Sequence, residues 1–277
     1  MQLFYITNRP DVALVAEKYG VDRVWVDLET RGKELRQKNL DTVKSHHCIE
    51  DISKIKPRLT AAEMMVRINS WYEDSAWEIE KVLEAGADWI MLPYWKTVEE
   101  VNQFLNVVKG RCKTSLLLET KEAVNCVDDV LTLGGFDEMH IGINDLCISY
   151  GKTFLFEMLT DGTVEFLCKK FKSVGIPYGF GGIARLGEGL LPAEKVLMEH
   201  YRLGSTRVIL SRSFCDYEGR SIEDIEKVFR QNVEALRQYE ATLPQMSKER
   251  LLENRQEVIC IVKEIVQSMQ LAKENGE

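Results

Sequence analysis

The sequence has few features of an extracellular, membrane-bound or nucleic-acid-binding protein. Its seven cysteines are scattered, odd in number and form no Cys-x-x-Cys pair, a pattern typical of a reduced, intracellular protein. The chain has no basic leader and no long apolar run, so we expect no secretory signal, no membrane span and a cytoplasmic location. The formal net charge is −8 and the basic residues form no stripe, which argues against nucleic acid as a partner.

Length and composition fit one large domain built from alternating strands and helices. The 277 residues are 45% hydrophobic, enough for a sizeable core that needs no disulfide or metal to fold. Eight strand-like segments alternate with helix-like segments, at residues 3–8, 23–29, 63–70, 89–94, 114–119, 138–143, 177–183 and 207–214. This alternation predicts an α/β fold, a (β/α)8 or TIM barrel.

Charged helical segments follow the last predicted strand. We expect the barrel to span residues 1–220 and a C-terminal helical extension to span residues 221–277, with a break at Pro244. The apolar residues of the last helix, among them Leu251, Ile259 and Ile265, recur at mixed helical spacings. This helix packs either on its own barrel or on a neighbouring subunit, and the second arrangement would make the protein a homo-oligomer.

Two apolar strands in the middle of the chain lead to carboxylates. Glu119 ends the segment TSLLLE, and Asp145 follows the strand in EMHIGIND. In a barrel, the carboxyl ends of neighbouring strands meet at one rim. Two oxygen ligands without a cysteine or a histidine pair suit Mg²⁺ or Mn²⁺ rather than zinc. We therefore predict a metal site at Glu119 and Asp145; the alternative is that both are solvated rim charges.

Arginines and glycines at other strand ends favour an anionic substrate. Arg67 lies in the third predicted strand and Arg212 at the end of the eighth, and guanidinium groups bind carboxylates at two points. Gly181 and Gly182, at the end of the seventh strand, allow backbone N–H groups to approach an anion. We predict all four as substrate-binding and Arg67 also as catalytic. Arg67 could instead be a structural ion-pair partner of the acidic residues at the end of the second strand.

The long polar loop after the second strand carries two adjacent histidines, His46 and His47. An imidazole with a pKa of about 6.5 suits proton transfer near neutral pH. We predict one of the pair as the general base and favour His47, which is nearer the following helix; solvated loop residues are the alternative. His140, by contrast, is expected to face the helix layer. No lysine stands at the end of a predicted barrel strand, so catalysis through a Schiff base is not expected.

Several segments together resemble one known family. VDLE (26–29), VRIN (66–69), LLLET (116–120), IGINDL (141–146) and the long run from Glu84 to Val101 are similar to the HpcH/HpaI aldolase and citrate lyase β-subunit family of the phosphoenolpyruvate/pyruvate barrels. The similarity runs in order through roughly residues 1–215. It implies that Glu119 and Asp145 bind a divalent metal, that Arg67 contacts the keto acid or its enolate, and that C-terminal helices reach a neighbour in an oligomer. The aldolases of this family carry a catalytic histidine where this chain has Thr30.

The expected activity is that of a class II, metal-dependent aldolase, a carbon–carbon lyase. A pyruvate-type 2-oxo acid or hydroxy-keto sugar acid would react through its enolate, with an aldehyde as the second small-molecule partner and Mg²⁺ or Mn²⁺ as cofactor. Two alternatives remain open: a coenzyme A thioester lyase of the citrate or malyl type, and a catalytically silent barrel that binds a sugar acid.

Overall fold

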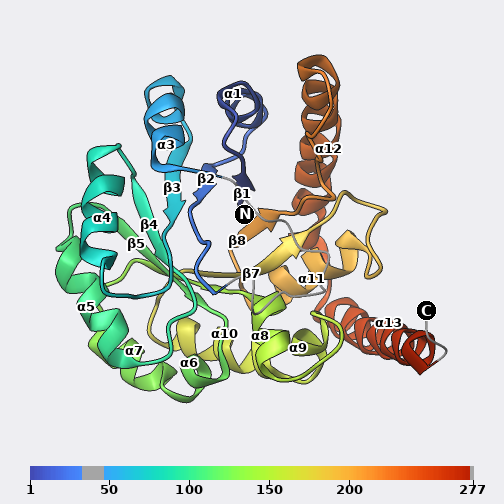
Figure 1. The fold of residues 1–277 in the computed structure, drawn as a ribbon. Helices are drawn as coiled ribbons and strands as arrows, with labels where there is room; N and C mark the ends of the chain where they lie inside the picture. Colours follow the sequence, from blue (N-terminus) through green and yellow to red (C-terminus); the bar gives the residue numbers. More distant parts are fainter. Residues whose placement is uncertain (33–46, 275–277) are drawn as a thin grey trace.

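The computed structural model describes residues 1–32 and 47–274, and its centre is a closed barrel of eight parallel strands in chain order (Figure 1). The strands are β1 (Gln2–Ile6), β2 (Arg23–Asp27), β3 (Glu63–Arg67), β4 (Trp89–Leu92), β5 (Lys113–Leu118), β6 (Glu138–Ile141), β7 (Tyr178–Ile183) and β8 (Arg207–Leu210). Pairing of β1 with β8 closes the barrel. The predicted TIM barrel is therefore confirmed.

Helices connect the strands and surround the barrel (Figure 1). They are α1 (Pro10–Lys18), α3 (Ile49–Ile55), η1 (Lys56–Arg58), α4 (Ser75–Glu84), α5 (Val98–Val108), α6 (Lys121–Asn125), α7 (Val127–Leu133), α8 (Ile143–Ser149), α9 (Glu157–Thr160), α10 (Thr163–Ser173), α11 (Ala193–Leu203), α12 (Ile222–Thr242), η2 (Leu243–Gln245) and α13 (Lys248–Glu274). α12 packs against α1 and buries Ile225 and Phe229 in the main core. It therefore lies beside the first helix of the barrel and shares the main core.

The last helix, α13, lies outside the ring and points away from the barrel (Figure 1). It packs against α11 and α9 of its own chain, where Val258 and Val262 are buried. Asn254 is also buried there, and its Nδ2 donates to the Lys195 carbonyl oxygen and to Glu199 Oε1, each at 3.1 Å. Packing on its own barrel is thus observed for this helix. Among the described residues, no helix has the length and apolar character needed to cross a membrane.

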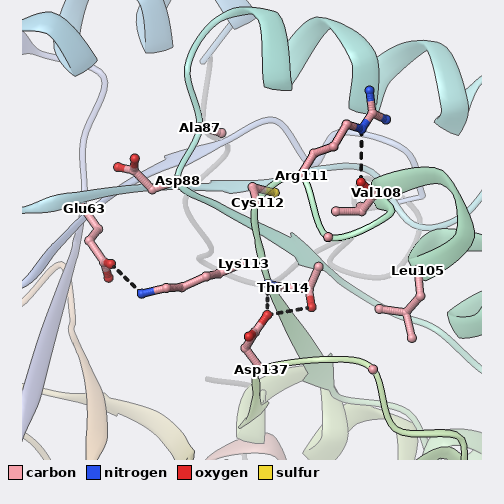
Figure 2. A pocket seen from close by; sticks show the side chains of 12 residues that line it. Glu63, Ala87, Asp88, Leu105, Val108, Arg111, Cys112, Lys113, Thr114 and Asp137 are labelled. Atoms are coloured by element: carbon pink, nitrogen blue, oxygen red, sulfur yellow. Dashed lines mark hydrogen bonds and ion pairs between the residues drawn. The ribbon is translucent and has the colours of Figure 1, made fainter.

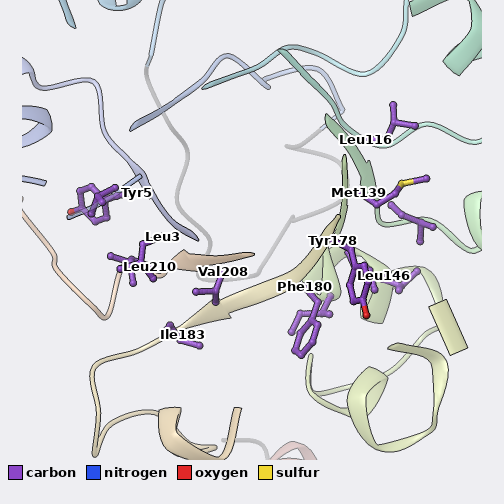
Figure 3. Packing of buried hydrophobic residues seen from close by; sticks show 14 of the residues in the cluster. Leu3, Tyr5, Leu116, Met139, Leu146, Tyr178, Phe180, Ile183, Val208 and Leu210 are labelled. Atoms are coloured by element: carbon purple, nitrogen blue, oxygen red, sulfur yellow. The ribbon is translucent and has the colours of Figure 1, made fainter. Parts of the chain in front are cut away.

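The outer face of the strands forms the main core with the helices. Side chains at alternate positions of β1, β7 and β8, such as Tyr5, Phe180 and Leu210, point outward and are buried (Figure 3). Because successive side chains of a strand point to opposite faces, the remaining positions fill the barrel interior. One apolar layer there consists of Phe4, Trp25, Met65, Trp89, Met91 and Leu117.

A layer of paired charges lies below this apolar layer, at the amino ends of the strands. Arg23 is 1% exposed, and its Nη1 donates to Glu138 Oε1 at 2.7 Å. Arg207 Nε donates to the second oxygen of the same carboxylate at 2.5 Å. The Arg23 guanidinium also lies 3.5 Å from the centroid of the Trp89 ring. The charges of this layer are therefore paired with one another. Together with the apolar layer they fill the barrel below the carboxyl ends of the strands, where the sites of TIM barrels form.

Candidate functional site

A cavity of about 560 Å³ opens at the carboxyl ends of the strands, the end that carries the active site in TIM-barrel enzymes. Its wall brings together the predicted residues His47, Arg67, Glu119, Asp145, Gly181, Gly182 and Arg212. His46 lies outside the described residues. Within the described part of the chain, the site residues predicted at separate strand ends therefore line one cavity.

Arg67 is anchored in the cavity wall by the carboxylates of the neighbouring strand end. Its Nε and Nη2 donate to the two oxygens of Asp27, each at 2.8 Å, and its Nη1 lies 3.4 Å from Glu29 Oε2. Burial disfavours the charged form, but the carboxylates of Asp27, Glu29 and Glu119 hold the pKa of Arg67 well above its usual value. Arg67 is therefore both an ion-pair partner and a permanent positive charge of fixed orientation beside the cavity.

The backbone of Asp27 also determines which ring nitrogen of His47 carries the proton. The Asp27 N–H donates to His47 Nδ1 at 3.0 Å. Because a backbone amide only donates, Nδ1 is unprotonated, and the neutral imidazole carries its proton on Nε2. While this hydrogen bond is made, the lone pair of Nδ1 is engaged; the role of general base expected for His47 from the sequence stays a prediction.

Glu119 is held between a strained turn and a glycine. Tyr94 has a φ of 51°, a left-handed conformation that is uncommon outside glycine, and its N–H donates to Glu119 Oε1 at 3.0 Å. On the other side, a Cβ on Gly142 would lie 2.5 Å from Glu119 Oε2 and 2.8 Å from Glu119 Cβ. Glu119 itself is 2% exposed. The turn and the glycine together set the position of this carboxylate.

The donor set fits a hard divalent cation. Asp145 lies in the first turn of α8 and is 8% exposed. Within residues 1–32 and 47–274, no group of three or more histidine, cysteine or acidic side chains is arranged to hold a metal. Mg²⁺ is usually held by one or two carboxylates and completes its shell with water and substrate oxygens. The carboxylates of Asp27, Glu29 and Glu119 surround the Arg67 guanidinium, and Asp145 lines the same cavity, so the added charge of a cation would be favourable here.

His140 was expected to face the helix layer, but it faces the barrel interior and lines the cavity. In the β5–β6 register it is the partner of Leu117, and its ring lies 6.2 Å from that of Phe4. The expectation was wrong because it extended the side-chain alternation of the strand as far as Asp145. Asp145 belongs to α8, so a period of two does not reach it. Glu138 lies two residues before His140 in β6 and also faces the barrel interior. Counting the alternation from Glu138 would therefore have placed His140 correctly.

The glycines of β7 accommodate an irregular strand. The register between β7 and β8 shifts between Gly179 and Gly182, and Gly181 has a φ of +52°. A Cβ on Gly181 would lie 2.5 Å from Ile143 Cδ1, so α8 can approach this strand closely. Gly181 and Gly182 therefore line the cavity with backbone rather than with side chains.

Arg212 connects the main cavity to a smaller one. The second cavity has a volume of about 140 Å³ and is also lined by Arg185 and Arg220. Arg185 pairs with Glu188 at 3.0 Å, whereas no ion pair of Arg212 or Arg220 is found in the part of the chain that the structure describes. These exposed guanidinium groups line the β7–β8 side of the mouth together with the acidic residues Asp216 and Glu218.

A further cavity, of about 520 Å³, lies at the opposite end of the barrel between β4, β5 and β6 (Figure 2). Its acidic residues already have partners. Asp137 accepts from the Thr114 N–H at 2.7 Å, and Glu63 pairs with Lys113 at 3.1 Å. This end of the barrel therefore has the character of a structural ion-pair layer.

Comparisons with known proteins agree with this architecture. A sequence model of the HpcH/HpaI aldolase/citrate lyase family matches residues 1–154, whereas no curated protein matches the chain. Solved structures with a similar fold include an HpcH/HpaI aldolase from Desulfitobacterium hafniense DCB-2, with 14% identity, a TM-score of 0.58, and coverage of 82% of this chain and 93% of that one. An HpcH/HpaI aldolase/citrate lyase family protein from Burkholderia cenocepacia J2315 shows 13% identity, a TM-score of 0.56, and coverage of 86% and 93%. RipC from Yersinia pestis shows 15% identity, a TM-score of 0.54, and coverage of 83% and 94%.

Proposed function

Because the chain belongs to the HpcH/HpaI aldolase/citrate lyase family, we propose that its cavity binds Mg²⁺ or Mn²⁺ with a 2-oxo acid and makes or breaks a carbon–carbon bond through a pyruvate-type enolate. The observation that carries this proposal is one cavity lined by both Glu119, a buried carboxylate of fixed position, and Arg67, an anchored guanidinium. Negative charge that develops on the oxo acid would meet a positive group that needs no reorganisation.

Glu119 and Asp145 would hold the cation, which when bound supplies Lewis-acid polarisation of the keto oxygen. Arg67 stabilises the oxygen on which negative charge develops, because Asp27 keeps its guanidinium in place. The positive charge alone would not require arginine, but simultaneous pairing with Asp27 and contact with the substrate requires a planar group with several donors.

In the tautomer that the hydrogen bond from Asp27 requires, His47 contributes an N–H rather than a lone pair. We assign it the role of a hydrogen-bond donor to the oxygen of the aldehyde partner, where negative charge develops as the new carbon–carbon bond forms. Arg212, at the edge of the mouth, suits an anionic group at the far end of that partner. Gly181 and Gly182 let the substrate approach the backbone of β7.

Exchange of the pyruvate C3 protons in deuterium oxide tests the enolate directly. We expect exchange that requires Mg²⁺ or Mn²⁺ and is lost in Glu119→Gln and in Asp145→Asn. Asp137→Asn, which alters a carboxylate in the cavity at the opposite end, is the matched control and should keep the exchange. Equal exchange in the presence of a chelator, or unchanged Mn²⁺ affinity of both site variants by calorimetry, would contradict the proposal.

Turnover measurements then separate the lyase activities. Hydroxy-keto acids should be cleaved to a 2-oxo acid and an aldehyde that a coupled dehydrogenase can detect. Turnover of acyl-CoA substrates in place of free acids would assign the chain to the thioester lyases. Metal binding without turnover in either panel would make it a silent binding barrel.

A further inference from the structure

His140 is a buried histidine with one nitrogen engaged and one that lacks a partner. Its side chain is 0% exposed, and Nε2 lies 3.2 Å from the Gly181 carbonyl oxygen. Because a carbonyl oxygen only accepts, Nε2 carries the proton and Nδ1 is left as an acceptor. Within the described residues, Nδ1 has no hydrogen-bond partner. Buried acceptors without a partner are rare and call for an explanation.

The imidazole lies at the floor of the cavity, below the carboxylate proposed to hold the cation. His140 pairs in register with Leu117, and Glu119 lies just past the end of β5, two residues after Leu117; all three line the cavity. Two residues of chain span at most roughly 7 Å, a distance that a small 2-oxo acid covers. The floor around His140 is otherwise built from large side chains, among them Trp25, Leu117 and Ile209. His140 Nδ1 is therefore an isolated acceptor buried within a mainly apolar floor.

We propose that His140 is a specificity-determining residue, whose Nδ1 accepts a hydrogen bond from a hydroxyl group on carbon 3 of the 2-oxo acid. The inference rests on the proposed function, since it places the oxo acid between the rim carboxylates and this floor. It narrows the substrate class to 3-hydroxy-2-oxo acids, which carry an O–H donor where pyruvate carries a methyl hydrogen. A site built to accept from an O–H discriminates strongly against an analogue that lacks it.

The charge state of His140 supports this assignment. Burial, opposed by the hydrogen bond to Gly181 and reinforced by Arg207, Arg23 and Arg67, lowers the pKa of His140 to about 4. The ring is therefore neutral near pH 7 and keeps its acceptor. The ring can therefore bind an O–H or N–H donor. A carboxylate or keto oxygen at the same place would be repelled by the lone pair of Nδ1.

Calorimetry with two probes that differ by one hydroxyl group tests the proposal. Pyruvate and hydroxypyruvate are titrated into the full chain with Mn²⁺ present. One hydrogen bond corresponds to about tenfold in affinity, so wild type should bind hydroxypyruvate about tenfold more tightly than pyruvate. His140→Leu should lose this preference while its pyruvate affinity stays within about twofold. His140→Asn, which can place an oxygen near the position of Nδ1, should retain part of the preference.

His200 provides a matched control for the loss of a buried imidazole. It is also 0% exposed, its Nδ1 lies 2.7 Å from Ser205 Oγ, and it stacks on Phe180 with ring centroids 3.7 Å apart. It faces the helix layer, outside the cavity, so His200→Leu should keep the preference for hydroxypyruvate.

Three results overturn the assignment and identify its cause. If wild type binds pyruvate and hydroxypyruvate equally, or if folded His140→Leu and His140→Asn both keep the full preference, Nδ1 is satisfied by a buried water instead. If wild type binds neither probe with Mn²⁺, the proposed function fails and this inference fails with it. Retained pyruvate binding distinguishes the first two results from the third.

Discussion

His140 should make the protein sensitive to acid in a defined pH window. Its pKa is lowered from 6.5 to about 4, mainly by burial. Above pH 6.5, the ring is neutral in both the folded and the unfolded chain, so its protonation does not affect stability. As the pH falls below 6.5, the unfolded chain binds a proton that the folded chain does not. The free energy of unfolding therefore falls between pH 6.5 and about pH 4. Below about pH 4, His140 causes no further change in it.

The size of the effect follows from the two pKa values. The full difference between 6.5 and about 4 corresponds to about 3 kcal/mol of unfolding free energy. Between pH 7.5 and pH 5, about 2 kcal/mol of this should be lost. His140→Leu removes the titrating group, so its stability should fall by about 2 kcal/mol less than that of wild type over the same interval.

Urea unfolding at pH 7.5 and pH 5, followed by circular dichroism, measures this difference. Comparison of the two proteins cancels the carboxylates that also titrate at acid pH. Met139→Leu, which changes the adjacent buried residue of β6, controls for an altered core and should show the pH dependence of wild type. If wild type and His140→Leu lose equal stability between the two pH values, His140 is not held neutral by burial, and the reasoning from its environment is refuted.

Three further predictions concern the cavity. Arg67→Lys should lower kcat/KM by roughly a hundredfold although it keeps the charge, because an ammonium cannot hold both oxygens of Asp27 and also contact the substrate; near-normal kcat/KM would assign Arg67 a structural role. Gly142→Ala, at a φ of −78° that alanine tolerates, should displace Glu119 and weaken Mn²⁺ binding about tenfold by calorimetry, and unchanged affinity would show that Glu119 is not a ligand. His47→Ala should keep pyruvate C3 exchange and slow addition to the aldehyde; loss of exchange would show that His47 leaves Asp27 and acts as the base.

The sequence by itself determined the architecture and the main composition of the cavity. Alternating apolar strands and amphipathic helices are local patterns, and eight such units fit a barrel whose strand ends meet at one rim. That rule was enough to bring Arg67, Glu119, Asp145 and Arg212 to a single mouth, because each follows or ends a strand.

Tertiary structure decided what each side chain does there. The orientation of His140 depended on where β6 ends and α8 begins, and sequence patterns locate such boundaries poorly. The tautomer of His47 depends on a hydrogen bond to Asp27, a residue twenty positions earlier. Likewise, the position of Glu119 depends on the left-handed turn at Tyr94 and the missing Cβ of Gly142. Local patterns thus fixed which residues reach the rim, whereas contacts between distant segments set their orientation and protonation, since hydrogen bonds and burial arise only when those segments pack together.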